Sequence, residues 1–214
     1  YVAAVTGKTA PGIGTCFSVL KYNPQGSLIW SRQYVDNNPK YLYSIPSDIV
    51  LDANCNIYIT GSRLLNDTMP LGQFPYYVIQ TTTAYTTFKY DSTGNLLWVR
   101  NKPRLYEYLA LGINASKFIS LDASGNIYIS GIMQGFSYSH NWSPDHYLMK
   151  NYDVVTVKYD NNGNELWTRI FSNKNSQPIP EIPTFPNTYE ELNAMVSDAD
   201  GNVYLTGRVY TDST

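Results

Sequence analysis

The two histidines of the chain lie in one short segment, which holds the side chains best suited to chemistry. The segment reads Ser139-His140-Asn141-Trp142-Ser143-Pro144-Asp145-His146-Tyr147. Imidazole and carboxylate groups bind transition metals or work as acid–base pairs, so His140, Asp145 and His146 are candidate metal ligands. Their spacing matches no established helical or strand arrangement of ligands. The competing interpretation, which we favour, is an exposed polar loop without a specific site.

Acidic turns form a second group of candidate ligands. The run from Asp198 to Asn202 alternates two carboxylates, as a calcium loop does, but no glutamate follows at the distance that closes such a loop. Four sister turns carry one acid each, at Asp52, Asp91, Asp122 and Asp160. An aspartate that accepts hydrogen bonds from the turn backbone, followed by Gly-Asn with positive φ, explains all five. We therefore predict turns and no metal.

Signatures of other function classes are absent from the sequence. It contains no nucleophile elbow, no glycine-rich phosphate loop and no Cys-x-x-Cys pair. Its 15 basic and 17 acidic residues give a net charge of −2, which offers no electrostatic footprint for nucleic acid. No apolar run approaches the ~20 residues of a membrane-spanning helix. We predict a non-enzymatic protein with no catalytic residues, no cofactor, no nucleic-acid partner and no membrane span.

The strongest feature of the sequence is a repeated hairpin around three tryptophans. Lys-Tyr-Asp-x-x-Gly-Asn-x-Leu-Trp-x-Arg occurs near Trp98 and Trp167, and a looser copy precedes Trp30. The copies are about 70 residues apart, which is the signature of a repeat protein. β-Branched and aromatic residues before the turn, and Leu-Trp after it, predict two strands joined tightly.

A second repeated hairpin alternates with the first. Asp-x-x-x-Asn followed by Ile-Tyr-Ile or Val-Tyr-Leu ends at Gly61, Gly131 and Gly207. Each copy reads as a strand, a turn and a second strand. The residues from Tyr1 to Gly7 match only its second half.

Together the two hairpins give units of four antiparallel strands. The chain 1–214 is predicted as one array, with three strands of a first unit at 1–35, complete units at 46–101 and 113–171, and two strands of a further unit at 193–210. Four antiparallel strands per repeat are typical of a β-propeller blade, whereas a solenoid usually has shorter repeats and more uniform turns. We predict an all-β fold with about three propeller blades.

The hairpin alternation places the short turns at one end of each blade and the long connections at the other. The long connections span 8–15, 62–83, 101–112, 132–152 and 172–191. Long loops are often functional. The candidate contacts with a ligand or partner are their aromatic residues Tyr76, Tyr77, Phe136, Tyr138 and Trp142. The alternative is that these rings pack the loops onto the sheets.

Two further residue sets follow from the blade arrangement. Trp30, Trp98 and Trp167 share one register in the fourth strands, so inter-blade packing is expected of them rather than sugar stacking. Cys16 and Cys55 lie at opposite ends of strands that are roughly 17–20 Å long. A disulfide needs Cα atoms within about 7 Å, so we expect Cys16 to be a buried thiol and Cys55 an exposed one, available for an intermolecular bond.

These motifs resemble the beta-propeller repeats of secreted and cell-surface bacterial and archaeal proteins (SBBP-type repeats). The resemblance covers 1–35, 46–61, 86–100, 117–131, 154–170 and 193–207. It implies an extracellular or cell-surface scaffold or adhesion module and supplies no catalytic residues to carry over. The chain departs from the pattern at Cys55, where the turn glycine is expected, and at Pro24-Gln25 in the first copy. Sequons at Asn66, Asn114 and Asn141 are compatible with secretion.

About three blades do not close a propeller ring. Two explanations remain open: the sequence is part of a longer array, or several copies complete a ring or filament through unpaired strand edges. The leading hypothesis is a structural or adhesive scaffold that binds partners through the long-loop face. Its partners would be further blades, other copies, or surface glycans and proteins. The alternative is a carbohydrate-binding or hydrolytic propeller with its site at the axial mouth of that face.

Overall fold

The structure is a computed structural model that describes residues 1–7, 15–35, 41–70, 77–102, 115–135, 151–171 and 189–210. Its regular elements in this part of the chain are β-strands, which confirms the predicted all-β class. The strands are β1 (Val2–Gly7), β2 (Thr15–Tyr22), β3 (Leu28–Tyr34), β4 (Tyr41–Leu51), β5 (Ile57–Pro70), β6 (Tyr77–Tyr90), β7 (Leu96–Lys102), β8 (Ala115–Leu121), β9 (Ile127–Gly135), β10 (Asn151–Tyr159), β11 (Glu165–Phe171), β12 (Tyr189–Ser197) and β13 (Val203–Tyr210). Within these ranges the chain has no helix of the length and apolarity that crossing a membrane requires.

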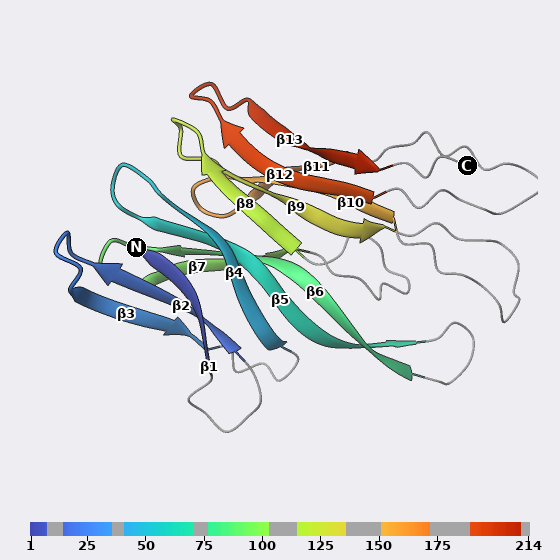
Figure 1. The fold of residues 1–214 in the computed structure, drawn as a ribbon, viewed down its shortest axis with the longest axis horizontal. Coiled ribbons are helices and arrows are strands. Elements are labelled where there is room, and N and C mark those ends of the chain that lie inside the picture. Colours follow the sequence, from blue (N-terminus) through green and yellow to red (C-terminus); the bar gives the residue numbers. More distant parts are fainter. Residues whose placement is uncertain are drawn as a thin grey trace, which may run out of the picture.

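The strands pair in chain order into antiparallel sheets (Figure 1). The first sheet is β1-β2-β3, the second is β4-β5-β6-β7, and the third is β8-β9-β10-β11. The β12–β13 hairpin joins the third sheet through one parallel bridge between Tyr152 and Tyr189. Four-stranded antiparallel sheets are thus confirmed, and the described residues form no closed ring.

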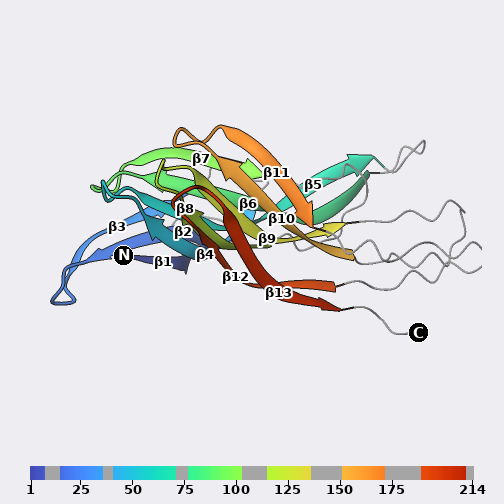
Figure 2. The same cartoon turned by 90° about the horizontal axis from the view of Figure 1, so that it is seen from above.

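The sheets are built from two kinds of hairpin, which we name by position; the first sheet has only the outer kind. An inner hairpin joins the first and second strands (β4–β5, β8–β9, β12–β13), and an outer hairpin joins the third and fourth (β2–β3, β6–β7, β10–β11). Their short turns lie at one end of the molecule in Figure 1. In Figure 2 the fourth strands β7 and β11 run along one side and β12 along the opposite side.

The six turns share one geometry, which their sequence dictates. In the β6–β7 turn the Gly94 N–H donates to the Asp91 carbonyl at 3.0 Å, and the Asp91 N–H donates to the Asn95 carbonyl at 2.9 Å. Gly94 has φ +89°, a backbone conformation that glycine adopts without steric cost. Cys55 takes the glycine's place in the β4–β5 turn, with φ +61°.

Glycine in each second strand allows the first strand to bulge toward it. Gly131 pairs with Ser116, the next pair is Ser130 with Phe118, and the residue between them is the bulge. A Cβ on Gly131 would overlap the Ala115 carbonyl and lie 2.6 Å from the Ser116 Cα. Gly61 and Gly207 face the same kind of bulge. In the first sheet the equivalent residue is Ala4, and none of the described strands pairs with that edge of β1.

Several predicted loop boundaries were wrong because the strands run further. The predicted connection over 62–83 is mostly sheet, since β5 and β6 stay paired from Ile57–Tyr90 out to Pro70–Tyr77. Threonine, valine, isoleucine and tyrosine dominate β6, and these residues favour extended pairing. β4 begins at Tyr41 and β12 at Tyr189, in both cases ahead of the predicted start.

Successive sheets pack face to face around two main apolar cores. Phe17, Val19, Ile59 and Phe88 lie at less than 2% exposure between the first and second sheets. Between the second and third sheets, Tyr58, Tyr85 and Met133 are buried together with three isoleucines, two valines and Tyr159. β8 contacts β4, β5 and β6, and β12 contacts β8, β9 and β10 in the same way. The β12–β13 hairpin therefore packs on the third sheet in the same way that the β8–β9 hairpin packs on the second sheet.

Candidate functional site

Each sheet carries the same four side chains on the face that it turns toward the next sheet. We call this set the Tyr–Lys–Trp–Arg cluster. It comprises Tyr1, Lys21, Trp30 and Arg32 in the first sheet, Tyr58, Lys89, Trp98 and Arg100 in the second, and Tyr128, Lys158, Trp167 and Arg169 in the third. The tyrosine comes from the second strand (Tyr1 directly precedes it in the first sheet), the lysine from the third, and Trp-x-Arg from the fourth.

The cluster is held together by aromatic and cation–π contacts. In the second sheet the Tyr58 and Trp98 ring centres are 6.3 Å apart. The Lys89 ammonium lies 5.1 Å from the Tyr58 ring, and the Arg100 guanidinium lies 5.5 Å from the Trp98 ring. Both distances fall within the range in which a ring face attracts a cation. The cluster therefore presents N–H and O–H donors around an apolar ring.

The second sheet's cluster binds the outer turn of the third sheet. The Trp98 indole N–H donates to the Asn161 carbonyl at 3.2 Å, and the Lys89 ammonium donates to the same carbonyl at 3.1 Å. Arg100 donates to the carbonyls of Asn162 at 3.0 Å and Gly163 at 2.6 Å. Because most acceptors are backbone carbonyls, the contact depends on the shape of the turn more than on its side chains.

The first sheet's cluster binds the second sheet's outer turn in the same way. Lys21 donates to the Ser92 carbonyl at 3.4 Å, and Arg32 donates to the Thr93 carbonyl at 3.4 Å. These distances are longer than those at the second sheet, so this copy of the contact is the looser one. The same cluster nevertheless donates to carbonyls of an outer turn at both interfaces between described sheets.

The turn glycine packs directly on the tryptophan of the cluster. A Cβ on Gly163 would lie 3.1 Å from the Trp98 ring and 3.0 Å from the Arg100 Nε. A Cβ on Gly94 would lie 3.3 Å from the Trp30 ring. Glycine is thus favoured at this position for two reasons: the backbone has a positive φ, and the tryptophan ring leaves little room for a side chain. Cys55 breaks the glycine rule only in an inner turn.

The third sheet's cluster is half covered among the described residues. The Tyr128 hydroxyl donates to the Gly201 carbonyl of the β12–β13 turn at 3.0 Å, and the Lys158 ammonium lies 3.7 Å from the Asp122 carboxylate. Arg169 donates to the adjacent Thr168 carbonyl and is exposed. No outer turn from the described part of the chain lies on Trp167 and Arg169.

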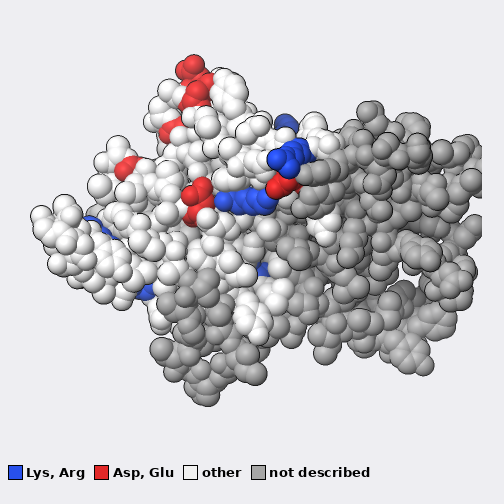
Figure 3. Space-filling view, viewed as in Figure 1, with Lys and Arg blue, Asp and Glu red and all other residues white. Residues whose placement is uncertain are grey.

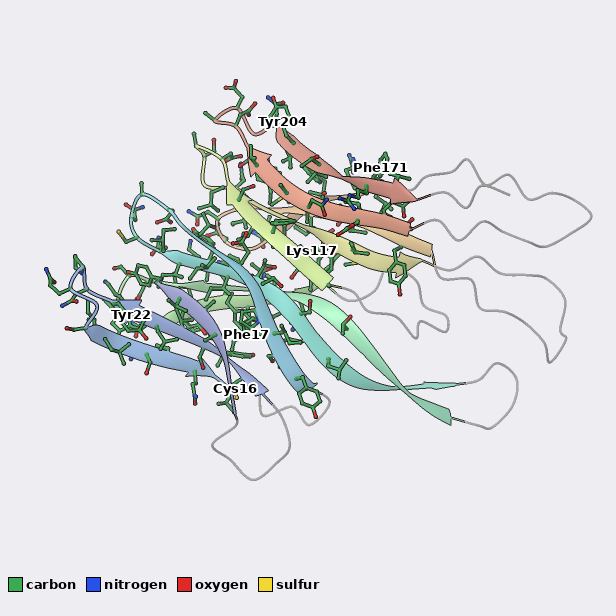
Figure 4. The ribbon with its side chains drawn as sticks, in the orientation of Figure 1. Cys16, Phe17, Tyr22, Lys117, Phe171 and Tyr204 are labelled. Carbon is green, nitrogen blue, oxygen red and sulfur yellow. The ribbon has the colours of Figure 1, made fainter. Side chains whose placement is uncertain are left out.

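Beside this half-covered cluster lies an apolar pocket of about 290 Å³. Val154 and Phe171 line it from the third sheet, and Leu192, Leu205 and Val209 line it from β12 and β13. Phe171 is 56% exposed, and Figure 4 shows it near the edge of the molecule. On the described part of the face in Figure 3, several acidic and basic groups lie next to one another, and Glu190, Glu191 and Arg208 also line the pocket.

The repeat register shows what fills the equivalent place elsewhere. Val154 pairs with Phe171 as Phe17 pairs with Tyr34 in the first sheet. Phe88 of the second sheet packs on that first-sheet pair, with ring centres 4.4 Å from Phe17 and 4.8 Å from Tyr34. At the interface between the first and second sheets, this position is filled by a side chain from the third strand of the second sheet. The pocket on the third sheet therefore lies where a third-strand side chain of a following sheet would pack.

Most residues predicted to contact ligands lie outside the described residues. This applies to His140, Asp145 and His146, and to the aromatic residues Tyr76, Phe136, Tyr138 and Trp142. Tyr77 begins β6 and pairs with Pro70, so its placement in a loop was wrong. Within the described ranges, no group of three or more His, Cys, Asp or Glu side chains is placed to hold a metal ion.

Both cysteines are free thiols, Cys16 buried and Cys55 exposed. Figure 4 shows Cys16 on β2 beside Phe17, whose ring packs against the second sheet. Trp30, Trp98 and Trp167 are half-buried in β3, β7 and β11, on the faces described above. Gly61, Gly131 and Gly207 lie opposite the first-strand bulges.

The binding role of the Tyr–Lys–Trp–Arg cluster was not predicted from the sequence. The tryptophans were assigned to inter-blade packing, but the accompanying lysine, tyrosine and arginine were given no role. Their recurrence in all three copies was the available signal, because strand propensity explains neither Lys at the third-strand position nor Arg two residues after Trp. Comparison of the sequence with protein-family models and with curated proteins finds no match.

We expect acid to loosen the turns on which these contacts depend. The Asn164 side-chain amide and the backbone N–H groups of the turn donate to Asp160 and lower the pKa of its carboxyl from the ordinary 3.8. Asp198 is shifted the same way, first by the Asn202 side chain. A lowered folded-state pKa adds stability above the unfolded-state pKa, and that stability is lost as pH falls through the folded-state pKa.

Urea unfolding at a series of pH values from 7 to 2 checks this expectation. The unfolding free energy should fall steadily below about pH 4. Asp160→Asn should be less stable than the wild type at pH 7 and less sensitive to acid. A stability curve that is flat down to pH 2 would contradict the assigned turn hydrogen bonds.

Proposed function

We propose that the chain is a non-enzymatic scaffold of β-propeller repeats that acts outside the cell or at its surface. In this proposal, sheets are added one after another, and each sheet binds the outer turn of the next through its Tyr–Lys–Trp–Arg cluster. The scaffold would join further blades of the same type and present its long connections to other partners. This makes the protein a structural or adhesive binding module.

One observation carries the proposal: the same cluster binds the same type of turn at two successive interfaces, and a third copy is half covered. A polar device repeated at equivalent positions of successive sheets is what a modular array requires. The third cluster conserves Lys158, Trp167 and Arg169 in the same geometry, with the Arg169 guanidinium 5.7 Å from the Trp167 ring. The interface is therefore preformed for a further sheet.

Contacts between first strands support the propeller arrangement over a simple stack. The Ser47 hydroxyl of β4 donates to the Ser116 carbonyl of β8 at 2.6 Å, and the Asp48 carboxylate accepts the Ile119 N–H at 3.0 Å. The Ser197 hydroxyl of β12 donates to the Leu121 carbonyl of β8 at 2.9 Å. First strands that touch in succession are expected when four-stranded blades surround a common axis. The resemblance to secreted propeller repeats points the same way.

Adding one more outer hairpin to the chain tests the proposed function. The chain would be lengthened after Tyr210 by a second copy of residues 136–171, which include an outer hairpin. A hairpin that docks on the third sheet should raise the thermal unfolding midpoint by roughly 5–10 °C, since a few kcal/mol shifts a chain of this size by that amount. Trp167→Ala should abolish most of this gain.

Leu166→Ala is the matched control for Trp167→Ala. Leu166 neighbours Trp167 on β11, is 52% exposed, and points to the other face of the strand. The lengthened chain with this substitution should keep its gain in midpoint. Equal midpoints for the original and lengthened chains, or a gain that survives Trp167→Ala, would overturn the proposed function.

A further inference from the structure

We infer that the half of the third cluster that no described residue covers, the adjacent pocket, and the edge of β13 with which no other described strand pairs form one binding site for a β-hairpin with a glycine turn. The ligand is the outer hairpin of another sheet of this repeat type, and the glycine at the fourth turn position is the residue that the site selects. This inference rests on the proposed function and deepens it by naming the ligand and its specificity.

The first part of the site is the donor set on β10 and β11. Lys158, Trp167 and Arg169 match Lys89, Trp98 and Arg100, which bind the carbonyls of three consecutive turn residues. In the second sheet this binding leaves Arg100 half-buried, whereas its equivalent in the third sheet, Arg169, is exposed. A turn of the same shape would give the third set the same acceptors.

The second part is the pocket between Phe171 and the β12–β13 hairpin. At the first interface the equivalent space is filled by Phe88, which is fully buried. Val154, Phe171, Leu205 and Val209 make most of the accessible lining apolar, and Glu190, Glu191 and Arg208 also line the pocket. It therefore fits an apolar side chain on the third strand of an incoming hairpin, and burial of that side chain is worth roughly 1.5–3 kcal/mol.

The third part is the outer edge of β13. β13 pairs with β12, and none of the other described strands pairs with its second edge. In the second and third sheets the second strand pairs with the third, as β5 does with β6 and β9 with β10. An incoming third strand would pair with β13 in the same order, which is recognition by strand addition.

These three parts favour a lone outer hairpin over an intact second copy of this chain. Of the three outer hairpins that the structure describes, β2–β3 alone has a turn that faces open space, with nothing within 4 Å of a Cβ on Gly26. β1 is already paired with β2 on the edge that β13 would have to occupy. A second copy would therefore have to release β1 before its β2–β3 hairpin could bind.

Selection of the turn glycine follows from the fit over tryptophan. At both filled interfaces a Cβ on the turn glycine would lie 3.0–3.3 Å from the Trp and Arg side chains below it. The backbone there also has φ near +80° to +90°. An L-alanine in the incoming turn would meet both obstacles, since the tryptophan ring and the guanidinium below it would have to shift by a few tenths of an ångström.

Calorimetric titration of the full chain with cyclised hairpin peptides tests the inference. The probe is a backbone-cyclised peptide of residues 83–102, prepared with glycine, L-alanine or D-alanine at position 94. We expect binding of the glycine and D-alanine peptides, and at least tenfold weaker binding of the L-alanine peptide. Trp167→Ala should weaken the glycine peptide at least tenfold, and Leu166→Ala should leave it unchanged.

The other outcomes of the titration distinguish the selection of glycine from the proposed function. Equal binding of all three peptides that still depends on Trp167 would overturn glycine selection and leave the proposed function standing. Failure of every peptide at 1 mM, together with no gain in the lengthened chain, would overturn both. If the chain itself forms dimers that the glycine peptide dissociates, a second copy is the occupant and the assignment to a separate hairpin is wrong.

The lengthened chain provides a second measurement in case the L-alanine peptide does not fold. Gly→Ala at the added copy of Gly163 should remove the gain in unfolding midpoint, because the added turn then cannot sit on Trp167. The gain should survive unchanged if the site does not select glycine. This readout requires no free peptide and no binding constant.

Discussion

Gly131→Ala is expected to lower the unfolding free energy by roughly 3 kcal/mol, because the added methyl group overlaps backbone. The ideal Cβ position lies 2.6 Å from the Ser116 Cα and 2.9 Å from the Ala115 carbonyl carbon. Neither neighbour is the end of a flexible side chain, so the bulge in β8 would have to move as a whole. That bulge lies next to Phe118, which packs on the apolar cluster of Ile132, Val154 and Leu192.

Urea unfolding of Gly131→Ala and of Ala4→Gly gives the comparison. Ala4 holds the same register position as Gly131, but no described strand pairs with that edge of β1. Ala4→Gly should therefore cost about 1 kcal/mol or less, the usual penalty of glycine in a strand. Equal losses for the two variants would mean that the bulge does not explain the second-strand glycines.

Trp98→Ala is expected to lower the unfolding free energy by about 3 kcal/mol. The substitution removes the ring that packs on Gly163 and Tyr58, and it removes the indole donor to the Asn161 carbonyl. It also leaves Arg100 without the aromatic face beneath its guanidinium. The contacts with Gly163 and the Asn161 carbonyl join the second sheet to the third, and those with Tyr58 and Arg100 hold the second sheet's own cluster together.

Trp167→Ala in the same chain is the matched comparison. Trp167 keeps its contact with Tyr128, at 6.0 Å between ring centres, but has no turn from another described sheet above it. Its loss should cost about 1 kcal/mol, well below the loss for Trp98→Ala. Chemical unfolding measured by circular dichroism distinguishes the two, and equal losses would argue against the assigned interface.

Local sequence signals located the short turns and the strands that flank them, although several strands run further than predicted. The Asp-x-x-Gly-Asn turns place glycine at positive φ, and Cys55 adopts the same conformation because its register in the repeat demands it. The alternation of the two hairpins correctly predicted four-stranded antiparallel sheets. Period-two patterning and turn chemistry act within a few residues, so they can be read from sequence alone.

Features that depend on long-range contact were not predictable in the same way. Arg100 and Gly163 are 63 residues apart, and nothing local to either residue indicates the other. The length of the β5–β6 pairing was also missed, because threonine-rich segments are compatible with both loop and strand until a partner strand is present. Repetition was the one long-range signal available, and it marked the cluster residues without indicating what they bind.

Nuclear Overhauser contacts of the tryptophan rings test the central claim most directly. The account predicts contacts from the Trp98 ring protons to the Gly163 α-protons, and from the Trp30 ring protons to the Gly94 α-protons. The Trp167 ring should show contacts to Tyr128 and none to a glycine of an outer turn. Trp98 and Trp30 rings whose only contacts are within their own sheets would contradict the account, because the sheets would then not bind one another through their turns.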